Sequence, residues 1–157
     1  MLMRDARELS PPASFGELGF ELRSWPTRCA DFTDDVEVVK TYYCEMMELI
    51  KTASGAKRVL IFDHTIRQSG KTNLNTAAGG VAAPVPRVHC DYTAEGAPRR
   101  LQQLGKAGFY SRVRERMLNE SDVAELARGR YAFINVWRSI SEEPVERMPL
   151  AVCAEVS

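Results

Sequence analysis

The clearest periodic pattern in the sequence predicts a helix that begins near residue 33 and ends before Gly55. Apolar residues recur there at spacings of four, three and four, which places them on one helical face; they are Val39, Tyr43, Met46 and Ile50. Thr33 or Asp34 can cap the amino end, and Gly55 can supply the left-handed residue that ends a helix. We interpret the stripe as core packing, because apolar residues at helical spacing usually face a core.

Shorter apolar runs predict strands around this helix. They are residues 20–25, 58–63 with a continuation to 67, the run that carries His89, 131–138 and 150–153. A long loop rich in glycine, alanine and proline covers 68–86, and helices are expected over 97–104, 109–118 and 121–127, the last capped by Ser121. Residues 1–19, with two prolines and a glycine, are expected to be a loosely ordered lead-in to one domain over 20–157.

Composition narrows the class of protein. The 157 residues hold 21 basic and 21 acidic side chains, so the formal net charge is zero and the pI is about 6.7. This balance predicts no nucleic-acid partner and no binding to an anionic membrane. The apolar runs are too short to cross a bilayer, and the first eight residues carry acids without an apolar signal core. We therefore expect a cytoplasmic protein.

The sequence around residue 90 contains the candidate chemistry. On an extended strand side chains alternate, so His89 and Asp91 should face the same way while Cys90 faces the other. An imidazole and a carboxylate are two of the three ligands in the 2-His-1-carboxylate site of non-haem Fe(II). The chain has one other histidine, His64, and it lies upstream. An ordinary hydrogen-bonded pair is the alternative, as is a zinc site that combines Cys90 with His89. The four cysteines form no C-x-x-C pair, so reduced thiols are expected.

Four motifs in order resemble a known family. They are Phe62-Asp63-His64-Thr65-Ile66-Arg67, Pro84-Val85-Pro86-Arg87-Val88-His89-Cys90-Asp91, Ile134-Asn135-Val136-Trp137-Arg138 and Met148-Pro149-Leu150-Ala151. Together they resemble the CmcJ/AsaB-type hydroxylase/desaturase family, which includes cephamycin 7α-hydroxylase-like and fungal gibberellin desaturase-like proteins. The resemblance runs from about Gly19 to the last residues. A lone H-x-D would be weak, whereas four ordered motifs are specific.

The resemblance implies an α+β fold, with an incomplete double-stranded β-helix (a cupin-like jelly roll) and flanking helices. It implies an oxidoreductase that uses Fe(II) and 2-oxoglutarate on a small natural product of secondary metabolism. His89 and Asp91 would be metal ligands. Arg138, which can bind a carboxylate through two hydrogen bonds, and Asn135 would lie at the cofactor. The candidate substrate-binding residues are Tyr92, Trp137 and Arg67. For Tyr92 and Trp137 the alternative is packing, and for Arg138 a salt bridge to a nearby glutamate.

Members of this family continue beyond the Pro-Leu-Ala motif to a distal histidine and a 2-oxoglutarate-binding arginine, which this chain does not contain. Three expectations follow. A second copy of the chain or a paralogue could supply the missing strands to a non-catalytic half-barrel subunit. His64 could instead serve as a surrogate ligand. Alternatively, the chain could be a metal-independent cyclase, isomerase or dehydratase, with His89, His64 and Asp91 as acid–base groups.

Overall fold

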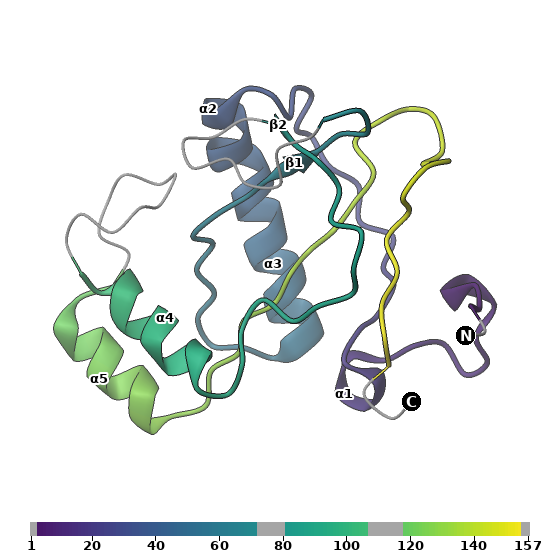
Figure 1. Ribbon diagram of the computed structural model, residues 1–157. Helices are drawn as coiled ribbons and strands as arrows, with labels where there is room; N and C mark the ends of the chain where they lie inside the picture. The colour runs from purple at the N-terminus through teal and green to yellow at the C-terminus, as the bar shows by residue number, and fades with distance from the viewer. Residues whose placement is uncertain (1–2, 72–80, 107–117, 155–157) are drawn as a thin grey trace.

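The computed structural model describes residues 3–71, 81–106 and 118–154 (Figure 1). Its elements are the 3-10 turn η1 (Ala6–Glu8), α1 (Phe15–Leu18), α2 (Asp35–Glu37), the π-helical η2 (Val38–Tyr42), α3 (Tyr43–Ser54), β1 (Ile66–Arg67), β2 (Val81–Ala82), α4 (Gly96–Leu104) and α5 (Glu120–Arg128). The expected helix over 109–118 lies almost entirely outside the described residues. Two short helical turns, η1 and α1, lie within the predicted lead-in.

The long helix predicted from the apolar stripe is confirmed. The Asp34 carboxylate accepts a hydrogen bond of 2.8 Å from the backbone N–H of Val36, which caps the amino end. At the other end Gly55 takes a left-handed conformation, with φ of 68°, and its N–H donates to the Lys51 carbonyl. Both ends of the helix are therefore set by residues next to them in the sequence.

One wide turn inside this helix changes which residues are buried. The N–H of Tyr43 donates to the carbonyl of Val38, five residues back, as in a π-helix. Residues five apart thus come close to the same face, and Val38 and Tyr43 are only 1% and 5% exposed. The predicted stripe began instead at Val39, which is half-buried. The prediction missed Val38 because it assumed α-helical periodicity throughout.

The main core lies between this helix and the chain before it. Cys29, Val38 and Tyr43 are buried there, and partly buried apolar side chains pack around them: Phe32, Val39, Tyr42 and Ile61. Glu45 ties the preceding segment to α3, because its carboxylate accepts hydrogen bonds from the Thr27 hydroxyl at 2.5 Å and the Arg28 N–H at 2.9 Å. These bonds hold an acidic side chain in a buried position.

Helices α4 and α5 pack against each other, at the lower left of Figure 1. A side chain at Gly105 would bring its Cβ within 2.5 Å of Val123 Cγ2, so the approach of the two helices requires glycine. The cap of α5 is Asn119 rather than the predicted Ser121. Asn119 and Asp122 exchange side-chain-to-backbone hydrogen bonds of 2.8 and 3.0 Å, which form a capping box. Ser121 lies one residue inside the helix, where it cannot cap.

We expect Asn119→Ala to lower the free energy of unfolding by about 1 kcal/mol, because it removes the side-chain oxygen that accepts a hydrogen bond from the backbone N–H of Asp122 in the first turn of α5. Urea unfolding followed by circular dichroism measures this. Ser121→Ala is the matched control and should change the free energy little. Equal effects of the two substitutions would contradict the assignment of the cap.

Strand pairing is where the structure departs most from expectation. Among the described residues the one sheet is two-stranded and parallel, with Ile66 opposite Val81 and Arg67 opposite Ala82. The predicted strands over 20–25, 58–63, 131–138 and 150–153, and the one that carries His89, are not part of any sheet, although β1 forms in the continuation to 67. An alternating sequence favours extended backbone, but a ladder also needs a partner at the right register. The jelly roll remains a prediction.

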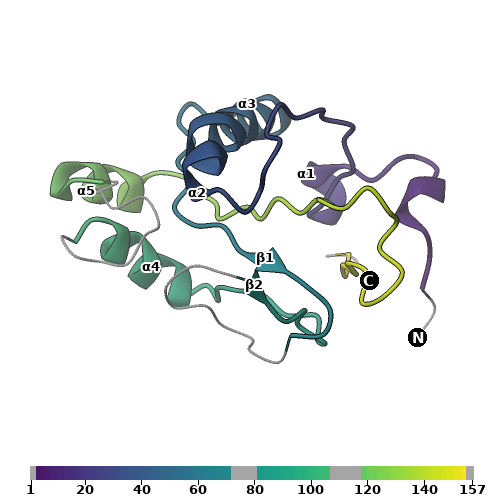
Figure 2. The same cartoon turned by 90° about the horizontal axis from the view of Figure 1, so that it is seen from above.

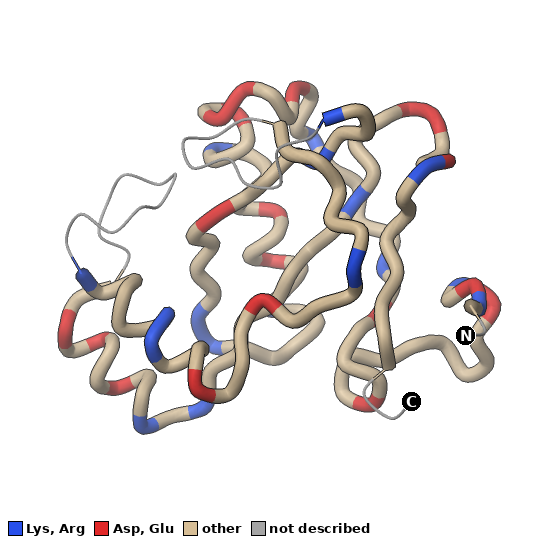
Figure 3. Tube along the Cα trace, in the orientation of Figure 1, with Lys and Arg blue, Asp and Glu red and all other residues tan. Residues whose placement is uncertain are grey.

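The chain after α5 runs between the long helix on one side and β1 and β2 on the other (Figures 1 and 2). Its side chains still alternate: Phe133 and Asn135 contact residues 92 and 91, whereas Arg138 contacts Phe32 and Tyr42 next to the helix. Acidic and basic residues are intermixed along the trace (Figure 3). In the part of the chain described, no helix combines the length and apolar character of a membrane span.

Candidate functional site

The segment that carries His89 and Asp91 is held at both of its ends. Upstream, β2 pairs with β1, and the Arg67 guanidinium donates a hydrogen bond of 2.9 Å to the Ala83 carbonyl. Downstream, the Thr93 hydroxyl accepts from the Gly96 N–H at 3.0 Å, which begins α4. Arg67, predicted to bind substrate, therefore makes a structural contact with the loop that follows β2.

His89 and Asp91 lie side by side, as their spacing predicts. The imidazole Nε2 is 3.2 Å from the carboxylate Oδ1, and the two side chains are 50% and 43% exposed. The segment around them belongs to no sheet, and the chain bends at Arg87 and at Asp91. Both groups nevertheless lie next to each other, where solvent can reach them.

The other ring nitrogen of His89 fixes its tautomer. Nδ1 lies 2.9 Å from the Arg87 carbonyl oxygen, which can only accept a hydrogen bond, so Nδ1 carries the proton. In the neutral ring Nε2 then presents a lone pair to the Asp91 carboxylate. Two acceptor atoms that face each other at this distance can share a cation. A histidine whose second N–H donates to a backbone carbonyl is also the usual arrangement at metal sites.

Asn135 completes the polar contacts of this pair. Its side-chain Nδ2 donates a hydrogen bond of 2.6 Å to Asp91 Oδ2, the oxygen that faces away from His89. The resemblance predicted a role for Asn135 at the cofactor, and the structure places it on the carboxylate of a candidate ligand. We call His89, Asp91 and Asn135 the polar cluster.

An aromatic group adjoins the polar cluster. The rings of Tyr92 and Phe133 have centroids 4.6 Å apart, Phe62 meets Phe133 edge-on at 5.9 Å, and the Arg100 guanidinium lies 4.9 Å from the Phe62 ring centroid. For Tyr92 the packing alternative is thus observed. Sequence reasoning missed Phe133 and Arg100. The alternation of Phe133 with Asn135 was the signal that could have identified Phe133.

Arg138 lies away from the polar cluster. Its guanidinium carbon is 5.9 and 5.7 Å from the ring centroids of Phe32 and Tyr42. Burial raises the pKa of Tyr42, and the charge of Arg138 acts in the opposite direction. In the described contacts the guanidinium lies against aromatic rings and not against a nearby glutamate, and the predicted cofactor contact stays a prediction. The odd spacing from Asn135 turns the two side chains to opposite sides.

His64 is also separate from the polar cluster. Its Nδ1 lies 2.8 Å from the Tyr43 hydroxyl and its Nε2 lies 3.1 Å from Asp35 Oδ1, so both ring nitrogens contact the long helix. Across the described ranges, no three His, Cys, Asp or Glu side chains are grouped to hold a metal. His64 therefore lies apart from His89 and Asp91 in this structure, and the surrogate-ligand and zinc expectations stay predictions. Cys90 is exposed with a free thiol.

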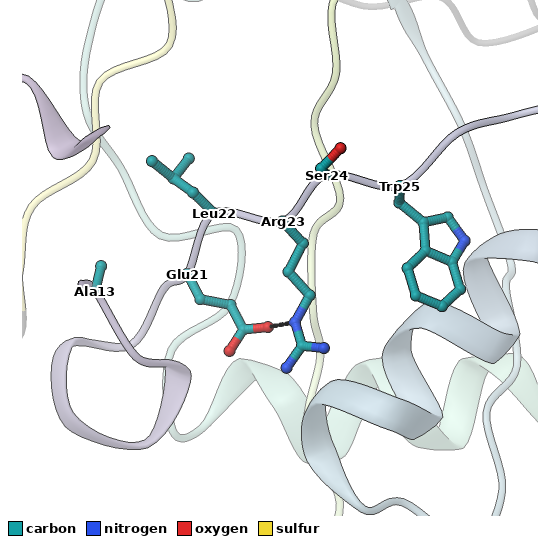
Figure 4. Close-up of a pocket in the computed structure, with 6 residues that line it drawn as sticks. All are labelled: Ala13, Glu21, Leu22, Arg23, Ser24 and Trp25. Atoms are coloured by element: carbon teal, nitrogen blue, oxygen red, sulfur yellow. Dashed lines mark hydrogen bonds and ion pairs between the residues drawn. The ribbon is translucent and has the colours of Figure 1, made fainter. Parts of the chain in front are cut away.

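Two remaining features lie outside the polar cluster. Trp137, predicted to bind substrate, is 49% exposed. A surface pocket of about 470 Å³ lies on the amino-terminal segment (Figure 4), and its lining contains none of the predicted site residues. The lining residues are Ala13, Glu21, Leu22, Arg23, Ser24 and Trp25. Glu21 and Arg23 point toward each other there and form an ion pair.

Comparison with known proteins gives a consistent result. The family model described as an oxidoreductase/YMDC permease-like domain matches residues 1–157. The hydroxylase/desaturase efuI of Hormonema carpetanum is 31% identical over 98% of this chain and 49% of its own length. The alpha-ketoglutarate-dependent dioxygenases phiK of Fungal sp. (strain ATCC 74256) and tstK of Talaromyces stipitatus are 31% and 34% identical, over 90% and 78% of this chain and 46% and 39% of their own. The chain spans about half the length of the curated relatives it matches. No solved structure matches it.

Proposed function

Because this chain belongs to the oxidoreductase/YMDC permease-like domain family, we propose that it acts as an Fe(II)/2-oxoglutarate-dependent oxidoreductase of the hydroxylase/desaturase type on a small natural product. The names of its relatives agree with the CmcJ/AsaB-type family predicted from the motifs. The observation that carries the proposal is the contact between His89 Nε2 and Asp91 Oδ1 at 3.2 Å.

The geometry of this pair fits two neighbouring positions around one metal ion. Nitrogen and carboxylate oxygen ligands bind first-row divalent metals at about 2.0–2.2 Å, so two ligands at right angles lie about 3 Å apart. The observed 3.2 Å between His89 Nε2 and Asp91 Oδ1 is close to that separation. Both atoms also present lone pairs toward the space between them. In this proposal His89 and Asp91 would supply two of the three protein ligands of a facial triad, and no third His, Cys, Asp or Glu is grouped with them among the described residues.

In this function His89 and Asp91 would hold Fe(II). The bound iron would supply the redox chemistry that couples 2-oxoglutarate and oxygen to substrate oxidation. The chain's own residues provide geometry: the Arg87 carbonyl keeps the proton on Nδ1 so that Nε2 can ligate, and Asn135 occupies the outer oxygen of Asp91. The rings of Tyr92 and Phe133, in contact at a tilt, would give the site an apolar neighbour.

Anaerobic titration of the chain with Fe(II) and then 2-oxoglutarate tests the proposal. We expect a metal-to-ligand charge-transfer absorbance in the visible region, because chelation of 2-oxoglutarate requires an iron with open positions. The same titration of His89→Ala should give no such band. A wild-type chain that binds neither iron nor 2-oxoglutarate would contradict the proposal.

The His89–Asp91 contact also supports a second candidate function. An imidazole 3.2 Å from a carboxylate can hold a proton and exchange it with a substrate, as in a metal-independent isomerase, cyclase or dehydratase. The two functions differ in their response to a chelator. Turnover that survives exhaustive chelation would favour the acid–base function, and turnover that is lost and then restored by Fe(II) would exclude it.

A further inference from the structure

We propose that Asn135 is a positioning residue that sets the orientation of the Asp91 carboxylate for metal binding. This inference rests on the proposed function, since it assigns to Asn135 a role toward the ion held by His89 and Asp91. The contact that carries it is the hydrogen bond of 2.6 Å from Asn135 Nδ2 to Asp91 Oδ2. It joins two segments that are 44 residues apart in the sequence.

The hydrogen bond gives the two carboxylate oxygens of Asp91 different partners. The terminal torsion of aspartate is broad, so an exposed carboxylate turns freely unless one oxygen is held. Asp91 is 43% exposed, and Asn135 holds Oδ2 while Oδ1 stays 3.2 Å from His89 Nε2. Oδ1 is therefore kept next to the nitrogen with which it would share a cation, and the two oxygens do not interchange.

The chemical type of the donor suits this role. An amide N–H is neutral, so Asp91 keeps its full negative charge for the metal, whereas a lysine or arginine at position 135 would form an ion pair and compete with it. Partners outside the ligand set typically change metal affinity by about 10–100-fold when they are removed. Asn135 and the Arg87 carbonyl act on the two candidate ligands in the same way, since each fixes the atom that does not face the metal.

The segment that carries Asn135 makes packing contacts on both sides of this residue. Two residues before it, Phe133 packs on Tyr92, and three residues after it, Arg138 lies against Phe32 and Tyr42. The first contact fixes the segment against the site and the second fixes it against the helical layer. The amide is thus placed by packing on either side and does not depend on the metal for its position.

Metal affinity measured by calorimetry with Co(II) tests the proposal, with the visible Co(II) spectrum as a second readout. We expect Asn135→Ala to weaken Co(II) binding by about 10–100-fold and to change the Co(II) spectrum. Asn135→Gln keeps an amide donor and should restore part of the affinity. Ser139→Ala is the matched control on the same segment, because its hydroxyl contacts only Ser141 in the described contacts. It should bind Co(II) as the wild type does.

The outcomes separate this inference from the proposed function. A wild-type chain that binds no Co(II) overturns the proposed function and the role of Asn135 with it. A wild-type chain that binds Co(II) while Asn135→Ala binds it equally well overturns the positioning role alone. Should alanine lower thermal stability, Asn135→Leu, which keeps the side-chain volume, is measured in its place. Wild-type affinity in a folded leucine variant would again overturn the role.

Discussion

Asp91→Ala should abolish divalent-metal binding by the chain, as measured by calorimetric titration with Co(II). In the proposed function the carboxylate would be one of two ligands among the described residues, and a single imidazole on an exposed segment is a weak site. The loss should therefore exceed the roughly 10–100-fold effect expected when an outer hydrogen-bond partner is removed. Asp91→Asn should also bind poorly, since it keeps the shape but loses the charge.

Glu146→Ala is the matched control for Asp91→Ala, because it removes another exposed carboxylate later in the chain. It should leave Co(II) affinity unchanged. Retention of wild-type affinity in Asp91→Ala would mean that any metal is bound elsewhere, and the proposed function would then lose its structural basis.

Glu45→Ala should lower the free energy of unfolding by about 2–3 kcal/mol, measured by urea unfolding at neutral pH. The carboxylate of Glu45 is only 8% exposed as a residue and accepts hydrogen bonds from Thr27 and Arg28, whose donors would lose their partner. Glu48→Ala, on an exposed position of the same helix, is the control and should have little effect. Equal losses in the two variants would contradict the role of the buried contacts.

The same carboxylate gives stability a defined pH dependence. The hydrogen bond from Thr27, followed by those from Arg28, lowers the pKa of Glu45 below its ordinary value of 4.5. A carboxyl group with a lowered pKa in the folded state contributes stability above its unfolded pKa, and this contribution disappears as the pH falls through the folded pKa. Wild-type stability should therefore fall in acid more steeply than that of Glu45→Gln.

Local signals in the sequence predicted local structure well. The long helix follows from an apolar stripe, a capping aspartate and a terminal glycine, all within a few residues of the features that they determine. The spacing of His89 and Asp91 predicted that the two side chains would lie together, and they do. The family was also predicted from the sequence, because four ordered motifs resembled it and the names of the relatives agree with it.

The same reasoning could not predict contacts between segments that are far apart in the sequence. The partner of Asp91 lies 44 residues away, and no local pattern indicates that Asn135 meets its carboxylate. The placement of Arg138 against Phe32 required knowing that the chain after α5 runs between two layers. Strands were predicted from alternation, but alternation does not tell which segment will pair with which.

The π turn at Val38–Tyr42 also sets the rotational phase between the two ends of the long helix. Asp35 precedes the turn and Tyr43 follows it, yet both contact the ring of His64. Deleting one residue from the turn would rotate everything beyond it by about 100° relative to Asp35. Gaps at this point in an alignment of related sequences should consequently coincide with replacement of the histidine at position 64.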